Sequence, residues 1–360
     1  MGNGKDHSQG SARSRFRKPK TKRRRLAFTL ITIGLSTVMA ACLAEVALRL
    51  FIDQEAKRLA TYDEMLGWRG RPNGSGVYVR KSDNIRVPFH YNNLGFRDED
   101  IAQKPPNVRR ILMLGDSFIE SLEVEYPKTF PALLERYVNK RSPDWEVAVV
   151  GSQGYSTSQE LLAFRRFHEV ISPDIVLLCF YCGNDFEDNL RPKFAFLNDA
   201  GKLEIPRNDE PKWKHSTRGL QRWLYESSHL AFLLKNSLES MANIRLEPDS
   251  KSATRADKNY RQEITRKLVI KLAEEVRATG AEFQVVVIPF RDDLIAGNQE
   301  NPSFIGGVCA DNNIPILDLS PLLDADKFFE TDVHFNLDGH EVVANAINAF
   351  IASSLVETKE

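Results

Sequence analysis

The chain has 360 residues, 42% of them hydrophobic, and its 49 basic side chains balance its 49 acidic ones. This length and apolar content allow one full-sized buried core, with residues left for an anchor and an insertion. The balanced charge excludes a global electrostatic attraction to nucleic acid, so no nucleic-acid partner is expected.

The N-terminus combines a basic tail with a long apolar run. Residues 1–25 are rich in Arg and Lys and poor in hydrophobic residues, so we expect a tail without a fold of its own. Residues 26–44 carry no charge, and the segment 26–51 predicts one transmembrane helix, a signal anchor. The positive-inside rule then keeps the tail in the cytoplasm and places the remainder in the periplasm or outside the cell.

Other interpretations of this segment stay open. A basic run is also typical of a nucleic-acid-binding arm, although its position directly before an apolar helix favours a role in topology. A cleaved signal peptide would have a shorter apolar run. The sequence Met39-Ala40-Ala41-Cys42 resembles a bacterial lipoprotein cleavage site, so processing at Cys42 is an alternative to a retained anchor.

Between the anchor and the main domain, residues 52–108 predict a stalk and a short β-containing approach segment. Turn-forming residues are frequent from 64 to 76, and two β-type runs follow at 77–79 and 85–87. A second feature of the segment is the sequence Asn92-Asn93-Leu94-Gly95-Phe96-Arg97, for which packing is the simplest role.

The region 109–355 alternates strand and helix patterns, which predicts an α/β domain with a parallel sheet. Helix patterns include one at 129–139, one opening with a capping box at Thr157-Ser158-Gln159-Glu160, and one that stops at Gly280. A polar region at 186–257 is too long for a crossover and predicts a cap or lid with a helix near 220–241. Four apolar runs are of strand length: 111–114, 147–150, 175–180 and 283–288.

The four cysteines do not predict disulfides or a metal centre. Cys179 and Cys182 flank an apolar strand, where residues three apart face opposite sides and cannot bridge easily. The spacing of Cys and His residues matches no metal-binding pattern, so we expect no metal and no cofactor.

Small polar residues follow three of the predicted strands, and in a parallel sheet such loops converge at one edge. The first loop contains Ser117, on a strand-to-helix turn after Gly115, which makes it a candidate nucleophile. The second contains Gly154 and the third Asn184, a backbone N–H and a side-chain amide that suit an oxyanion.

A serine nucleophile needs a base, and His334 is the best placed of the seven histidines. It lies in a loop before the last amphipathic helix, about 338–353, and Asp332 two residues earlier could orient its ring. His340, inside that helix, is the competing candidate, with capping or covering the helix as its expected role.

Taken together, these blocks resemble the GDSL or SGNH hydrolase family. Gly115-Asp116-Ser117-Phe118 is similar to its first block, Gly154 to its second, Gly183-Asn184-Asp185 to its third, and Asp332 with His334 to its last. The sequence departs from the family pattern at Val149, where an asparagine is usual, and at Thr331, where the family usually places the aspartate.

The resemblance implies a three-layer α/β/α fold, flavodoxin-like, with Ser117 as nucleophile, His334 as base and Asp332 as its orienting partner. It also implies an oxyanion hole made by the N–H groups of Ser117 and Gly154 and by Asn184. We expect an extracytoplasmic esterase that cleaves an acyl ester on a small molecule, a glycan or a lipid. The alternatives are an O-acyltransferase acting on a surface or secreted polysaccharide, and a non-catalytic protein of an export assembly.

Overall fold

The computed structural model describes residues 20–51, 59–80, 82–206, 224, 227–243 and 255–357. The chain divides into two compact units, Met1–Ile52 and Asp53–Glu360. We describe each unit by itself.

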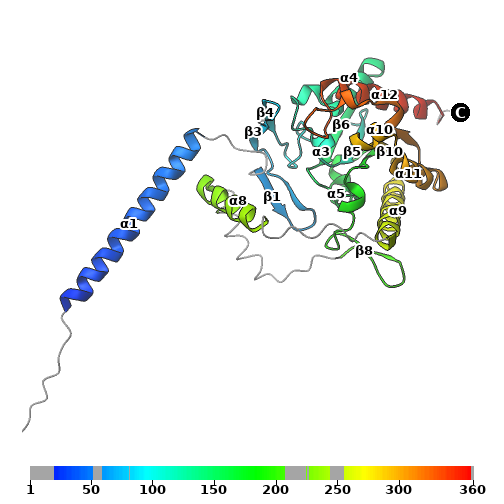
Figure 1. The fold of residues 1–360 in the computed structure, drawn as a ribbon. Coiled ribbons are helices and arrows are strands. Elements are labelled where there is room, and N and C mark those ends of the chain that lie inside the picture. Colours follow the sequence, from blue (N-terminus) through cyan, green and yellow to red (C-terminus); the bar gives the residue numbers. More distant parts are fainter. Residues whose placement is uncertain are drawn as a thin grey trace, which may run out of the picture. The chain divides into compact units, whose positions relative to one another are not determined.

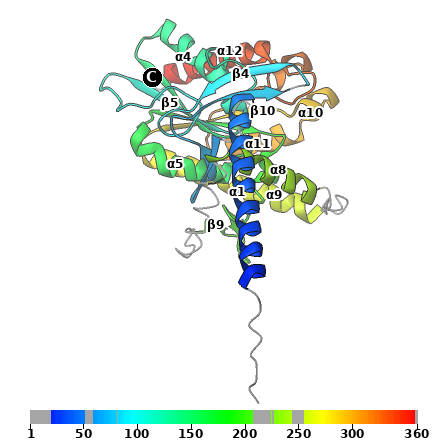
Figure 2. The same cartoon turned by 90° about the vertical axis from the view of Figure 1, so that its left-hand side faces the viewer.

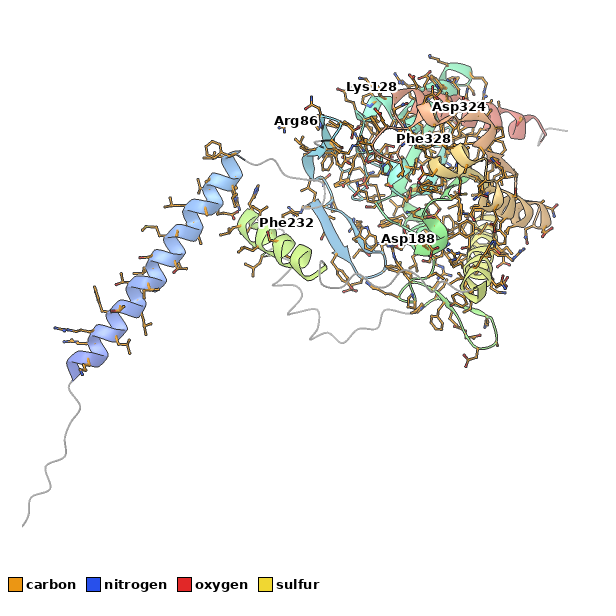
Figure 3. All side chains as sticks on the ribbon, viewed as in Figure 1. Arg86, Lys128, Asp188, Phe232, Asp324 and Phe328 are labelled. Atoms are coloured by element: carbon orange, nitrogen blue, oxygen red, sulfur yellow. The ribbon has the colours of Figure 1, made fainter. Side chains whose placement is uncertain are left out.

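The first unit contains one long helix, α1 (Lys20–Phe51). Its part Arg24–Phe51 is 28 residues long, which at about 1.5 Å per residue exceeds the roughly 30 Å of a bilayer's hydrocarbon core. Its apolar side chains project outward along the helix (Figure 3) and none of that segment is buried. Length and composition therefore fit a membrane anchor or a signal sequence.

The second unit is built on a five-stranded sheet in which every neighbouring pair is parallel. The spatial order is β11-β10-β7-β5-β6, which is the order 2-1-3-4-5 of flavodoxin-like folds when the strands are numbered along the chain. The predicted fold class is thus confirmed. The strands are β5 (Arg109–Gly115), β6 (Trp145–Gly151), β7 (Ile175–Tyr181), β10 (Glu282–Ile288) and β11 (Ile316–Asp318).

Helices cover both faces of this sheet, as Figures 1 and 2 show. On one face α4 (Phe130–Arg141) packs beside α12 (Leu337–Glu357), and on the other α5 (Thr157–Ile171) packs beside α9 (Arg255–Ala278). Alternate strand residues point to opposite faces. Accordingly Leu112 and Leu114 belong to the core under α5 and α9, whereas Ile111 and Met113 belong to the core under α4 and α12.

Two details differ from the sequence prediction. The fifth strand, β11, was not predicted, because its three residues are too short to show a period. The capping box of α5 lies one residue earlier than predicted: Ser156 is the N-cap and pairs with Gln159, while Thr157 already belongs to the helix. Ser and Thr both cap helices, so the sequence alone did not separate the two. The remaining described helices are α3 (Ser117–Glu120), α6 (Asp185–Asp188), α8 (His229–Asn243), α10 (Arg291–Ala296) and α11 (Glu300–Asp311).

The approach segment forms two hairpins, β1 (Ala60–Asp63) with β2 (Gly67–Gly70) and β3 (Ser75–Arg80) with β4 (Ile85–His90). It packs into the same unit as the sheet: Leu66 and Phe96 are fully buried in the core under α5. From Leu59 onward the described part of this segment is therefore joined to the sheet domain and does not stand apart from it.

Arg97 and Asp98 explain why the approach segment ends on the sheet. The Arg97 guanidinium is 2% exposed and donates to the backbone carbonyls of Glu120, at 3.0 Å, and Val124, at 2.6 Å. The Asp98 carboxylate accepts from the backbone N–H of Val149 on β6 at 2.8 Å. The Asn92–Arg97 sequence thus does more than pack, because it fixes the chain that follows Ser117.

The predicted insertion at 186–257 is described only in part. It contains a short hairpin, β8 (Phe196–Leu197) with β9 (Leu203–Glu204), and helix α8, which overlaps the helix predicted near 220–241 and ends two residues beyond it. Residues 220–223 and 225–226 of that prediction lie outside the described residues. The cap or lid role remains an expectation.

Candidate active site

Ser117 is the first residue of the four-residue helix α3, directly beyond the carboxyl end of β5. The Asp116 side chain caps this helix by accepting from Phe118 N at 2.9 Å. β5 lies between β6 and β7 in the sheet, so Ser117 sits at the point where the strand order reverses. In open α/β folds this is where ligands bind.

A tight approach of two strand ends shapes the floor beside Ser117. A Cβ placed on Gly151, at the end of β6, would lie 2.2 Å from the carbonyl oxygen of Gly115. Only glycine fits there, because such a distance is far below van der Waals contact. The loops after β5 and β6 are thereby held next to each other.

The structure brings three of the predicted site residues together. Nε2 of His334 lies 2.8 Å from Oγ of Ser117, and Nδ1 of His334 lies 2.5 Å from Oδ1 of Asp332. The same Asp332 oxygen accepts the backbone N–H of His334 at 3.0 Å. A neutral imidazole in this position can accept the hydroxyl proton through Nε2 while Nδ1–H is held by the carboxylate.

Aromatic packing holds the His334 ring in place. Phe118 lies 5.0 Å from the imidazole, and Phe335, 1% exposed, lies 4.8 Å from Phe118. The backbone of the loop is fixed as well, since Phe329 N donates to the carbonyl of His334 at 2.9 Å. The base thus belongs to a packed wall, which restricts the rotation of its ring.

The charges around His334 favour its protonated form. Burial lowers the pKa of His334, but the hydrogen bond with Asp332 and the charges of Glu123, Asp332 and Asp116 together raise it above its ordinary 6.5. Burial raises the pKa of Asp332, but hydrogen bonds with His334 and the charges of His334 and Arg80 lower it to about 2. Asp332 is therefore ionised throughout the neutral range.

Arg80, at the end of β3, reaches the other oxygen of the Asp332 carboxylate. Its Nε lies 2.7 Å from Asp83, whose carboxylate accepts the hydroxyl of Thr331 at 2.5 Å. The Arg80 guanidinium also stacks over the ring of Phe329, 4.5 Å from its centre. The hairpin β3–β4 is thus tied to the loop that carries His334.

A second carboxylate, Glu123, also faces the imidazole, with Oε1 3.6 Å from Nδ1 of His334. Among the described residues, the group that comes close enough to share a metal ion is Glu123, Asp332 and His334. Nδ1 of His334 already hydrogen-bonds to Asp332, and Arg80 already supplies a positive charge to Asp332. The group fits a hydrogen-bonded base better than a metal centre.

Sequence reasoning missed Glu123 and Arg80. Neither follows a strand end or sits at a recognisable spacing from Ser117 or His334. No signal in the sequence identifies them, because their proximity depends on where the approach segment packs.

The competing histidine, His340, lies elsewhere. Its ring is 2% exposed, its Nδ1 accepts the backbone N–H of Phe130 at 3.1 Å, and it stacks on the Phe130 ring. Burial lowers the pKa of His340 to about 3. It is a neutral residue that accepts a hydrogen bond at the N-terminus of α4, whereas the sequence had suggested that it caps or covers its own helix.

The two predicted oxyanion donors are linked by a polar bridge. Gly154, with φ +70°, is at a turn position that favours glycine, and its carbonyl accepts from Nη1 of Arg191 at 2.6 Å. Arg191 also pairs with Asp188 at 2.5 Å, and Asp188 accepts from Nδ2 of Asn184 at 3.1 Å. The bridge runs from one donor loop to the other.

The Asn184 amide donates through Nδ2 to the Asp188 carboxylate, at 3.1 Å. An amide nitrogen has two hydrogens. Donation from Asn184 to an oxyanion would therefore use the second hydrogen or replace the contact with Asp188.

Buried acids lie under the strand ends. Asp116, Glu160 and Asp185 are almost fully buried, and each has a carboxylate oxygen without a hydrogen-bond partner in the part of the chain described here. Burial, reinforced by the Asp116 charge, raises the pKa of Glu160 far above its ordinary value; burial also raises the pKa of Asp116, to about 6. Glu160 is thus held in its protonated, neutral form.

A cavity of about 280 Å³ opens beside the Asn184 loop. Its rim carries the ion pairs Lys258–Glu300 and Arg261–Glu187, and Phe290 forms part of its wall. The Phe290 ring lies 6.5 Å from that of Tyr181, which lies 4.3 Å from that of Phe118. The lining residues are Cys182, Gly183, Phe186, Glu187, Lys258, Arg261, Gln262, Phe290, Asp293, Asn298, Glu300 and Asn301.

No family model and no curated protein matches this sequence. Solved structures with a similar outline include TesA, 12% identical with a TM-score of 0.42, covering 68% of this chain and 98% of that one. An esterase EstA from Pseudoalteromonas sp. is 12% identical with a TM-score of 0.41, covering 69% and 98%. A putative acylhydrolase from Bacteroides fragilis is 14% identical with a TM-score of 0.41, covering 71% and 92%. Similarity this low does not establish an activity, so the case for function depends on the site itself.

Proposed function

We propose that the chain is a serine esterase of the SGNH type that cleaves an acyl ester through attack by Ser117. The single observation that carries the proposal is the hydrogen-bonded series from the Ser117 hydroxyl through His334 to the Asp332 carboxylate. A hydroxyl, an imidazole and a carboxylate in this order are the parts that acyl transfer needs.

In the proposed reaction, Oγ of Ser117 attacks the ester carbonyl carbon while Nε2 of His334 takes the hydroxyl proton. The tetrahedral intermediate then collapses, and the imidazolium returns that proton to the departing alcohol oxygen. Water attacks the acyl-serine in the second half, again losing a proton to His334, which passes it back to Oγ. The carboxylic acid leaves and the free serine is restored.

The oxyanion of each intermediate would be stabilised by the N–H groups of Ser117 and Gly154 and by the Asn184 amide. The α3 N-terminus at Ser117 and the fixed turn at Gly154 support this assignment. For Asn184 we propose that its amide donates to the oxyanion through the Nδ2 hydrogen that does not face Asp188.

The cavity beside Asn184 supports a polar substrate, such as an acylated glycan, over a long-chain lipid. Its wall carries two ion pairs and three side-chain amides, those of Gln262, Asn298 and Asn301. An alkyl chain gains nothing from such groups and would leave them desolvated. A sugar can exchange its hydroxyl–water hydrogen bonds for bonds to them.

For localisation, we propose that α1 is a retained membrane anchor with the basic N-terminus in the cytoplasm and the catalytic unit outside it. The apolar length of the helix and the Arg- and Lys-rich residues before it support this orientation.

The test is a substrate panel for the full-length protein in detergent. We expect turnover of p-nitrophenyl acetate and of acetylated sugars, and at least tenfold lower kcat/KM for esters of long-chain fatty acids. Efficient cleavage of long-chain acylglycerols would contradict the polar substrate, and inactivity on every ester would contradict the esterase. Adding a free sugar acceptor shows whether the acyl group goes to a hydroxyl in place of water.

A further inference from the structure

Two carboxylates face the same nitrogen of His334. Asp332 lies 2.5 Å from Nδ1 and Glu123 lies 3.6 Å from it. They come from distant parts of the chain and differ in exposure: the Glu123 side chain is 2% exposed and that of Asp332 is 19% exposed. Solvent screens a buried charge less than an exposed one. Glu123 can therefore still act strongly on the His334 imidazole, although it lies farther away than Asp332.

Glu123 is held rigidly in its place. The Arg97 guanidinium binds the carbonyls of Glu120 and Val124, on either side of Glu123. Burial and the nearby Glu123 carboxylate raise the pKa of Tyr78, so the phenol near Glu123 stays protonated.

Asp332, by contrast, divides its charge between two partners. One oxygen faces His334, and the other faces the Arg80 guanidinium. Arg80 fixes the carboxylate, but its positive charge also offsets part of the attraction that Asp332 exerts on a protonated imidazole.

Both carboxylates are fixed from a single strand of the approach segment. Tyr78 and Arg80 are two residues apart on β3, and residues with this spacing lie on the same face of a strand. Tyr78 is near enough to Glu123 for their charges to interact, and Arg80 contacts Asp332.

We propose that Glu123 is a second carboxylate partner of His334, which stabilises the imidazolium together with Asp332, and that Tyr78 and Arg80 on β3 position the pair. The proposal rests on the proposed function in one respect, because it gives His334 the role of base. It extends that function to residues outside the four sequence blocks, and it makes Glu123 a positioning residue acting through His334.

The consequence is a base that tolerates the loss of either carboxylate. Without Asp332, Glu123 still faces Nδ1 at 3.6 Å; without Glu123, Asp332 keeps its hydrogen bond. The removal of both leaves a buried imidazole without any carboxylate partner at Nδ1, and this disfavours the imidazolium that acyl transfer requires.

The first experiment is a double-mutant cycle on kcat/KM for p-nitrophenyl acetate, with Asp332→Asn, Glu123→Gln and the double variant. We expect each single substitution to reduce kcat/KM by about 10- to 100-fold and the double to reduce it by about ten-thousand-fold or more. An Asp332→Asn variant as inactive as the double, together with a fully active Glu123→Gln variant, would overturn the proposal.

The second experiment measures the pKa of the His334 imidazole in the absence of substrate. An NMR titration of the His334 ring should show a lower pKa in Glu123→Gln than in the parent protein, because a nearby negative charge is removed. The other charged or titratable groups that face the ring, namely Asp332, Asp116 and His340, are unchanged in this variant. An unchanged pKa of His334 would overturn the proposal.

Two further variants separate this effect from a general loosening of the fold. Tyr78→Phe removes the hydroxyl that lies near Glu123 and leaves the Glu123 charge less stabilised, so the pKa of His334 should rise, opposite to the Glu123→Gln result. Glu125→Gln is the matched control, since Glu125 is an exposed neighbour paired with Lys128, and it should change neither kcat/KM nor the titration. A fall in the pKa with Tyr78→Phe would count against the proposal.

Failure of the esterase proposal and failure of this one give different results. A parent protein without esterase activity, or an active Ser117→Ala variant, refutes the esterase and leaves the titration to decide whether Glu123 acts on His334. If the parent protein is active and Glu123→Gln leaves the pKa of His334 unchanged, only the proposal that Glu123 is a second carboxylate partner is refuted.

Discussion

The hydroxyl of Ser117 and Nε2 of His334 lie 2.8 Å apart, although 217 positions of sequence separate them. Ser117 depends on the end of β5, and His334 depends on a loop held by Phe335 and by the hairpin β3–β4. The contact exists only when the whole second unit is folded. Agents that unfold the unit should therefore remove activity and this contact together.

Covalent labelling should identify the nucleophile. A fluorophosphonate probe forms a bond between its phosphorus and Oγ of Ser117, with loss of fluoride, because His334 accepts the hydroxyl proton. We expect peptide mapping to find the label at Ser117. A label at another serine, retained in Ser117→Ala, would redirect the assignment.

The two histidines near α12 should respond oppositely to substitution. His334→Ala should lower kcat/KM about thousandfold or more with an unchanged melting temperature, since the ring is the proposed base. His340→Phe keeps the stack on Phe130 but removes the acceptor for its backbone N–H, so stability should fall by about 1–3 kcal/mol while activity persists. A loss of activity with His340→Phe and a loss of stability alone with His334→Ala would instead indicate that His340 is the base.

The pH dependence of kcat/KM should reflect the raised pKa of His334. Burial lowers this pKa, but the hydrogen bond with Asp332 and the surrounding carboxylates raise it above 6.5. The base must be neutral, so activity is full above this pKa and falls as the pH drops through it. We expect the acidic limb of the profile to have its midpoint above 6.5; a midpoint below 6 would contradict the electrostatics described for the site.

Arg80 should matter for the rate although it touches no reacting atom. Arg80→Met leaves the Asp332 carboxylate without its ion pair, and a lost charged hydrogen bond of about 1.5–3 kcal/mol corresponds to a roughly 10- to 100-fold fall in kcat/KM. Arg86→Met is the control, because Arg86 lies on the same hairpin with an exposed side chain (Figure 3). Equal kinetics for the two variants would show that Arg80 does not support the base.

Glu160 should make the fold less stable in alkaline solution. Its folded-state pKa is raised far above its ordinary value, chiefly by burial, so the folded protein binds this proton more tightly than the unfolded chain. Stability from this group is full at low pH and declines as the pH rises above the unfolded pKa. Glu160→Gln mimics the protonated acid and should flatten this decline in urea unfolding, whereas Glu169→Gln, on the exposed side of α5, should not.

Local patterns were enough to predict much of the fold. Four of the five sheet strands are continuous apolar runs, which is typical of strands buried on both faces. β11 has only three residues, and its pairing with β10 depends on the sheet that is already there. The shift from Thr157 to Ser156 at the start of α5 has the same origin, since two adjacent residues could cap equally well and packing chose between them.

The residues of the site also divide into those that local sequence patterns predict and those that only the packing brings together. Ser117, His334 and Asp332 were found because a strand end and a loop before a helix are local features that converge in a parallel sheet. Glu123 and Arg80 become neighbours of His334 only through the packing of the approach segment, which no local pattern records. The amide of Asn184 was predicted to donate to an oxyanion, but no local pattern indicated that Asp188 would accept from it.

The most direct test of the central claim is the rate of p-nitrophenyl acetate hydrolysis by Ser117→Ala compared with the parent protein. The account predicts a loss of about ten-thousand-fold or more in kcat/KM, with the circular dichroism spectrum and melting temperature unchanged. Equal rates in the two proteins would contradict it.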